Sequence, residues 1–143
     1  MANYPLPSFH FSISWGGDDL GFSEVSGLSQ ELQSIDYKDG LMGQAFPLKI
    51  DGQRKSGNVT LKRGLVTDKN DLFEWFNNNG KPGVERRTVI INLLNDEGNP
   101  VFKWTLINAF PVKVTGADLK ASGNDIAVES VELVHEGITQ GKV

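Results

Sequence analysis

Few residues of this chain have the type and spacing that catalysis requires. The two histidines, His10 and His135, could each serve as a base or a ligand, but no metal-ligand spacing accompanies either of them. The paired carboxylates Asp18–Asp19 and Asp96–Glu97 fall in predicted turns, where acidic residues are common. We therefore expect no catalytic residue, no metal and no cofactor, and we expect that the chain is not an enzyme.

A glycine-flanked basic segment at residues 52–57 faintly resembles a phosphate-binding loop. It lacks the G-x₄-G-K-[ST] spacing and the following helix, so we reject that reading. Lys49, Arg54 and Lys55 instead favour contact with an acidic partner, or a solvated loop. Specific nucleic-acid recognition fits poorly, because the chain is acidic overall, with a net charge of −4 and a pI of about 5.1.

The composition is that of an ordinary globular domain. The chain has 143 residues, 38% of them hydrophobic and 22% charged, and no cysteine. The lack of cysteine excludes disulfides, thiolate metal sites and a thiol nucleophile. No apolar run reaches the roughly 18 residues of a membrane helix, and the first residues, Met1–Pro7, do not resemble a secretory signal. We expect one soluble domain over residues 1–143, made in a cytoplasm and not inserted in a membrane.

Charge is unevenly spread along the chain. Residues 1–36 contain five acids and no base, residues 37–113 contain 12 bases and 8 acids, and residues 114–143 contain two bases and five acids. Such a molecule could complement a copy of itself head to tail, or folding could intermix the segments with no consequence. Charge alone does not separate these two interpretations.

The hydrophobic pattern predicts a mainly β fold with one helix. The spacing of apolar residues predicts strands at Phe9–Trp15, Gln33–Tyr37, Asn58–Arg63 and Val101–Phe110. It also predicts a strand with apolar residues on both faces at Arg87–Leu94, and a last strand at Ile126–His135, in which the apolar phase slips. An apolar stripe that includes Leu72 and Trp75 predicts a helix over about 68–79. Residues 38–57 show little periodicity and are expected to form an extended, functional loop. We expect a small antiparallel β-barrel or sandwich with one flanking α-helix.

Six phrases, taken in order and at their spacing, carry a resemblance to a known family. They are Phe22–Leu28, Tyr37–Gly40, Leu61–Gly64, Leu72–Trp75, Trp104–Pro111 and Val134–Gly137. Together they resemble the tail tube protein family of contractile phage tails, and most of all the inner tube proteins of extracellular contractile injection systems. The resemblance extends from about Tyr4 to Gly137.

This resemblance implies a tail-tube-like fold related to the haemolysin-coregulated protein of type VI secretion. It implies hexameric rings that stack into a rigid hollow tube, which a contractile sheath drives through a target envelope. The implied partners are further copies of the chain, the sheath protein, the baseplate hub or spike, tube-terminating proteins, and a luminal cargo of effector protein or DNA. The implied location is a phage tail or an extracellular or membrane-attached particle, assembled in a bacterial cytoplasm.

The resemblance also suggests which residues meet each partner. Expected contacts between subunits or rings are Lys38, Asp39, Lys49, Arg54, Lys55, Asp18 and Asp19. Expected sheath-facing residues of the helix are Asp68, Lys69, Asp71 and Glu74. Expected lumen-lining residues are Lys103, Thr105, Glu129 and Glu132.

Two other functions remain open on the residues alone. A carbohydrate- or ligand-binding β-sandwich would use exposed aromatic rings such as Trp15, Trp75 or Trp104. A hydrolase would use His10 or His135 as its base.

Overall fold

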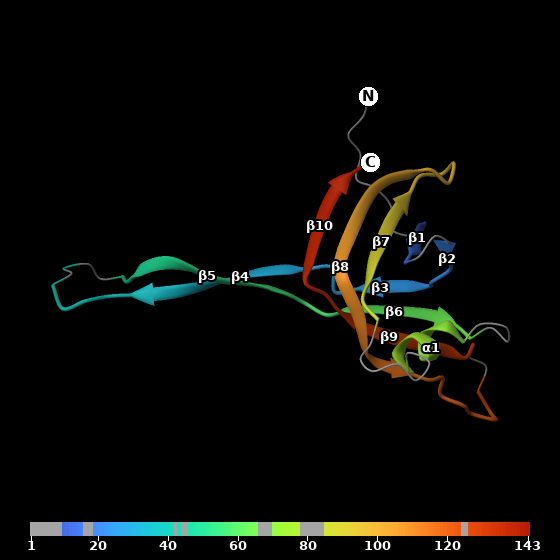
Figure 1. Cartoon of the computed structure of the whole chain (residues 1–143). Helices are drawn as coiled ribbons and strands as arrows, with labels where there is room; N and C mark the ends of the chain where they lie inside the picture. Colours follow the sequence, from blue (N-terminus) through green and yellow to red (C-terminus); the bar gives the residue numbers. More distant parts are fainter. Residues whose placement is uncertain are drawn as a thin grey trace.

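The fold consists of a β-sheet body and one two-stranded arm (Figure 1). The computed structural model describes residues 10–15, 19–41, 43, 46–65, 70–77, 85–123 and 126–143. The strands of the body are β1 (Phe11–Ser14), β2 (Asp19–Leu20), β3 (Glu24–Ser26), β6 (Val59–Gly64), β7 (Arg87–Leu94), β8 (Pro100–Thr115), β9 (Val128–Val134) and β10 (Gly137–Lys142). The arm is β4 (Gln30–Tyr37) with β5 (Leu48–Ser56), and the helix α1 is Asp71–Asn77.

Strand β8 connects the two halves of the body. The strand order is β2-β1-β7-β8-β9-β6-β3, and β10 also pairs with β8; all these pairings are antiparallel. The first half of β8 lies between β7 and β10, whereas its second half pairs with β9. The strand is irregular where the partner changes, because Asn108 has a positive φ of 51° and the register with β9 shifts between Pro111 and Lys113. These irregularities let one strand of 16 residues serve both halves.

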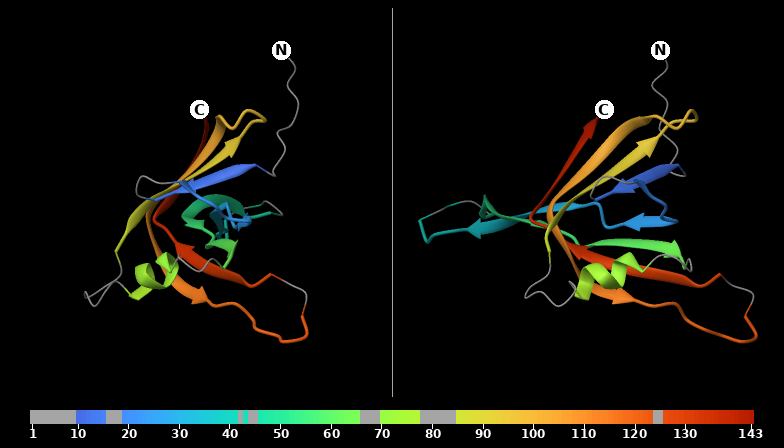
Figure 2. Two further views of the ribbon diagram at one scale, coloured as in Figure 1. Left: turned by 90° about the vertical axis from the view of Figure 1, so that its right-hand side faces the viewer. Right: turned by 45° about the vertical axis from the view of Figure 1, so that its right-hand side comes forward.

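The core lies inside the curve of this sheet. Buried apolar side chains come from both halves: Ile13, Val59, Leu61, Val89, Ile91, Leu106, Val131 and Leu133. Helix α1 lies beside the second half of β8 (Figure 2) and adds Leu72 and Trp75 to this core. The Trp75 ring centroid is 5.0 Å from that of Trp15, and its indole N–H donates a hydrogen bond of 2.7 Å to the Glu85 carbonyl. The expected mainly β, tail-tube-like fold with one flanking helix is confirmed.

Two expectations need correction, and the bounds of the helix can be given more closely. Residues 48–56 form strand β5 rather than part of a loop, because Leu48 and Ile50 alternate with charged residues and pair with β4. Strand β10 was not expected, because Ile138 is its one apolar residue. Among the described residues, the helix spans seven residues, Asp71–Asn77, within the expected range; residues 66–69 and 78–84 lie outside the described part.

A buried ion cluster links α1 to the sheet. The Arg63 side chain is 4% exposed; its Nε donates to Glu129 Oε1 at 2.7 Å, and its terminal nitrogens donate to the Asp71 carboxylate. Burial alone would lower the pKa of Arg63, but the hydrogen bonds and charges of Asp71 and Glu129 outweigh this effect, so its pKa is raised. The two acids therefore hold a permanent cation inside the fold.

Replacing Arg63 by alanine leaves the Glu129 carboxylate buried without its cation. We expect Arg63→Ala to lower the free energy of unfolding by about 3–5 kcal/mol in urea denaturation of the isolated chain. The matched control is Lys62→Ala, because Lys62 is exposed and its ion pair with Glu24 is 3.9 Å long. This control should cost less than about 1 kcal/mol. Equal costs for the two variants would contradict the structural role of the cluster.

Candidate assembly surfaces

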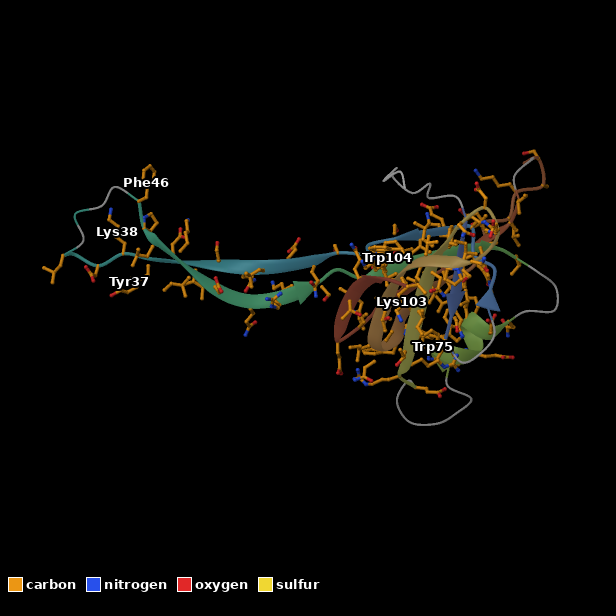
Figure 3. All side chains as sticks on the ribbon, turned by 90° about the horizontal axis from the view of Figure 1, so that it is seen from above. Tyr37, Lys38, Phe46, Trp75, Lys103 and Trp104 are labelled. Atoms are coloured by element: carbon orange, nitrogen blue, oxygen red, sulfur yellow. The ribbon has the colours of Figure 1, made fainter. Side chains whose placement is uncertain are left out.

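The first candidate contact surface is the arm. Within the part of the chain that the structure describes, β4 and β5 pair only with each other, and they extend far from the other strands (Figure 1, Figure 3). In the outer half of the arm, Ile35 lies opposite Ile50 and Tyr37 lies opposite Leu48, so these four apolar side chains share one face. The other face carries Asp36 opposite Lys49, and their ion pair is 2.6 Å long.

The apolar face of the arm is open to solvent in the single subunit. Its four side chains are 47–53% exposed, and at the tip Phe46 is 80% and Leu41 is 97% exposed. A two-stranded hairpin by itself is at best marginally stable in water. Contiguous apolar surface of this kind marks a site of protein contact. The arm is therefore a binding element that lacks its partner in the single subunit.

The base of the arm is fixed to the body. The Gln30 side-chain amide donates a hydrogen bond of 3.1 Å to the Ile138 carbonyl of β10. The register between β4 and β5 shifts between Leu32 and Ser34. At this bulge Gly52 lies so close to β4 that a Cβ atom would be 2.8 Å from the Gln33 carbonyl oxygen. The bulge and the anchor together set the direction in which the arm leaves the body.

The structure places most of the expected contact residues on this arm. Lys49 faces Asp36, Lys55 faces Glu31, and Arg54 faces Leu32, all on exposed positions. Lys38 and Asp39 lie at the tip, where the Asp39 carboxylate accepts hydrogen bonds from the Leu41 N–H and the Tyr37 hydroxyl. Asp18 lies outside the described residues, and Asp19 belongs to β2, where it pairs with Ser14.

The apolar pairs of the arm were missed in the sequence. The segments Ile35–Tyr37 and Leu48–Ile50 each alternate apolar and charged residues, and Gly40 and Gly43 lie between them. That combination is a hairpin signal with a long connection. The hairpin was not predicted because the segment between the two alternating runs is glycine-rich and has no regular apolar spacing.

The second surface is the polar face of the sheet. Along each strand its side chains alternate with the buried ones. Cross-strand pairing places these side chains in rows. In the first half of the body the rows are Ser14–Ile90–Thr105–Thr139 and Ser12–Asn92–Lys103–Gly141. In the second half they are Glu24–Lys62–Ser130–Thr115 and Ser26–Thr60–Glu132–Lys113. This polar sheet face extends across both halves of the body.

Three of the four expected lumen residues share this polar sheet face. Lys103 and Thr105 lie in its first half, and Glu132 lies in its second half, where it accepts a hydrogen bond of 3.3 Å from the Asn58 amide. Glu129 does not belong to this face. It is 2% exposed and paired with Arg63 inside the subunit, so a lumen-lining role for this residue was wrong. In β9, Glu129 has the same alternation phase as the buried Val131.

The third surface is the solvent side of α1. Glu74 is exposed, as expected of a residue that meets an outer partner. Asp71 instead turns toward the body and binds Arg63. Asp68 and Lys69 lie outside the described residues. Of the four expected sheath-facing residues, Glu74 is therefore the one described side chain that is exposed.

The carbohydrate-binding alternative loses the feature that suggested it. Trp15 and Trp75 are buried in the core, and Trp104 is partly buried, with its indole N–H donating a 2.9 Å hydrogen bond to the Gln140 side chain. None of these three rings is an open platform for a sugar. In the part of the chain that the structure describes, no group of three or more His, Cys, Asp or Glu side chains is placed to hold a metal ion. The structure also has, within its described residues, no helix long and apolar enough to cross a membrane.

Comparison with known families identifies the type of protein. Residues 7–139 match the family described as the T4-like virus tail tube protein gp19. No significant match was found among curated proteins.

Solved structures agree with the family match. A chain of the PVC sheath–tube complex of an extracellular contractile injection system, in the extended state, is 34% identical, with a TM-score of 0.90; the alignment covers 99% of this chain and 94% of that one. A chain of the anti-feeding prophage tube-terminating cap is 31% identical, with a TM-score of 0.90, covering 100% and 95%.

A more distant structure shares the fold. Hcp1 from Flavobacterium johnsoniae is 17% identical, with a TM-score of 0.61, covering 94% of this chain and 98% of that chain. Its low identity shows a common fold only. The family that matches consists of structural tube proteins and is not known to be enzymatic. The chain therefore belongs to the T4-like virus tail tube protein family, as a structural component of a contractile tail-like particle.

Proposed function

We propose that this chain is the inner tube subunit of a contractile injection system or phage tail. Six copies close into a ring, and the rings stack into a rigid hollow tube. A contractile sheath surrounds the tube and drives it through a target envelope, and the tube conducts effector protein or DNA. The observation that carries this proposal is the amphipathic arm, because its apolar face requires another protein surface.

Repeated copies of the chain are the natural partner for the arm. The arm protrudes from one side of the body, so it reaches a surface that its own body does not offer (Figure 1). Contacts between two different surfaces of identical subunits generate rings or open helical stacks. The exposed bases Arg54 and Lys55 on the arm and the acidic ends of the sequence favour the same head-to-tail arrangement.

The polar sheet face suits the lumen of the tube. It mixes hydroxyl groups and amides with charges of both signs, among them Lys103, Lys113 and Glu132. Ile90 is the one apolar member of the four rows, so such a wall is largely hydrated and offers little apolar surface to a passing cargo. Glu74 of α1 belongs to a different side of the body, and we assign that side to the sheath.

The relatives support the remaining partners. The similar chains come from a sheath–tube complex, a sheath/tube terminator and a baseplate. We therefore assign this chain the same kinds of partner: a sheath protein, a baseplate hub or spike, and a terminating protein. Assembly takes place in a bacterial cytoplasm.

Disrupting the apolar face of the arm should block assembly without unfolding the subunit. Wild-type protein at high concentration should show hollow six-fold rings or tubes by negative-stain electron microscopy. Ile50→Asp should raise the concentration needed for assembly at least about tenfold, which corresponds to about 1.4 kcal/mol of lost contact energy, with the melting temperature of the dissociated subunit unchanged.

The matched control for this variant is Gln53→Asp, which adds the same charge at an exposed position of the same strand. We expect it to assemble at nearly the wild-type concentration. Wild-type protein that stays monomeric at both low and high salt would argue against a tube subunit. Equal effects of the two substitutions would show that the apolar face is not a contact.

Charge reversal on the arm should act through electrostatics. The double variant Arg54→Glu, Lys55→Glu should weaken stacking more than folding, and high salt should reduce its difference from wild type because salt screens exposed charges. Light scattering of both proteins over a range of salt concentrations measures the difference in the extent of assembly. A collapse of thermal stability, with normal assembly of the protein that remains folded, would refute the assignment.

Thiol reactivity can distinguish the lumen from the outside, because the chain has no cysteine of its own. In assembled tubes without sheath, Lys103→Cys should react with a small maleimide but not with one attached to a large polymer. Glu74→Cys should react with both reagents. In dissociated subunits the two variants should behave alike. Reaction of Lys103→Cys with the large reagent along intact tubes would place the polar sheet face outside.

A further inference from the structure

The body carries a hollow between β8 and β9, on the side away from the arm. It has a volume of about 220 Å³ and is lined by Asp118, Lys120, Gly123, Ile126 and Val128. Its apolar wall is open, since Ile126 is 79% exposed. The neighbouring Leu119 is also exposed, so the hollow lies within a larger apolar area.

The size and lining of this hollow favour a protein side chain over a small ligand. Ligand sites usually enclose about 300–1,000 Å³. The hollow is smaller and combines an apolar wall with one acid, Asp118, and one base, Lys120. Such a site suits a single large apolar side chain that has opposite charges beside it.

The tip of the arm has these complementary features. Phe46 is an exposed aromatic ring at the tip, and Lys38 lies close to it on the other side of the hairpin connection (Figure 3). Asp39 follows Lys38 in the sequence. The tip thus offers one base and one acid around an apolar group. The Asp39 carboxylate is hydrogen-bonded to the Leu41 N–H and the Tyr37 hydroxyl, which orders this turn.

The tip and the hollow cannot meet within one chain. The arm leaves the body on one side, and the segment that joins β8 to β9 projects on the opposite side (Figure 1). A contact between them therefore joins two copies, and it repeats from copy to copy because the two surfaces differ.

We propose that the hollow lined by Asp118, Ile126 and Val128 receives the Phe46 side chain of the arm tip of a second copy, with Lys38 beside Asp118. This inference rests on the proposed tube function and identifies the acceptor of the arm. It gives the exposed residues Asp118, Ile126 and Val128 a role in contacts between subunits. Any other occupant of the hollow becomes an outcome of the test.

Disulfide trapping tests the contact directly. Tubes of the double variant Phe46→Cys, Ile126→Cys should give a ladder of covalent multimers after mild oxidation, on a non-reducing gel. The matched control is Phe46→Cys, Lys103→Cys, whose second thiol lies on the polar sheet face; it should give only background dimer. The single variant Ile126→Cys should not cross-link to itself, and self-linked dimers would show that the body of another copy occupies the hollow.

The outcomes separate the two proposals. If wild-type protein forms tubes but the Phe46/Ile126 pair links no better than the control, the hollow is not the acceptor and the tube function stands. If wild-type protein forms no ring or tube, the proposed function fails, and this inference fails with it.

Charge exchange provides a second test if the cysteine variant does not assemble. Asp118→Lys should raise the concentration for assembly severalfold by placing two bases together. Adding Lys38→Asp in the same chain should return that concentration to within about twofold of wild type. Absence of rescue, with both variants folded by circular dichroism, would overturn the pairing.

Discussion

The structure depends on one constraint: the arm exposes an apolar face that it cannot bury by itself. Ile35, Ile50, Tyr37 and Leu48 are paired across two strands, and among the described residues no third strand covers them. Each such side chain gains roughly 1.5–3 kcal/mol on full burial, and about half of that gain is still available in the single subunit. The body is therefore packed while the apolar face of the arm is not, and the proposed assembly would supply the missing contact.

Specific contacts connect the arm, the two halves of the sheet and the helix. Strand β8 belongs to both halves of the sheet, so the two halves share one continuous backbone. The Arg63–Glu129 pair fixes β6 to β9, and Asp71 fixes the helix to the same cation. Gln30 ties the base of the arm to β10. A structural tube subunit has to transmit force between its contacts, and these links join the arm, the sheet and the helix into one unit.

Regular alternation allowed much of the body to be predicted from the sequence. The strand Arg87–Leu94 and the helix core around Leu72 and Trp75 follow directly from their apolar spacing. Strand β4 of the arm was predicted in part, as Gln33–Tyr37, but β5 and β10 were not. The irregular segment before β5 obscured its short alternating run, and β10 contributes Ile138 alone to the core. Glu129 was predicted to line the lumen because a carboxylate in a strand usually faces solvent. Its buried partner Arg63 lies 66 residues away in the sequence, so the pair could not be recognised from local spacing.

The central claim is that the apolar face of the arm is covered and stabilised by another copy of the chain. Amide hydrogen exchange, followed by mass spectrometry on dilute subunits and on assembled protein, tests it most directly. We predict that peptides covering 30–37 and 48–56 exchange quickly in the dilute subunit and become protected on assembly, while peptides covering β7 and β8 are protected in both states. An arm that is equally protected in dilute subunits, or that stays unprotected in assembled protein, would contradict this account.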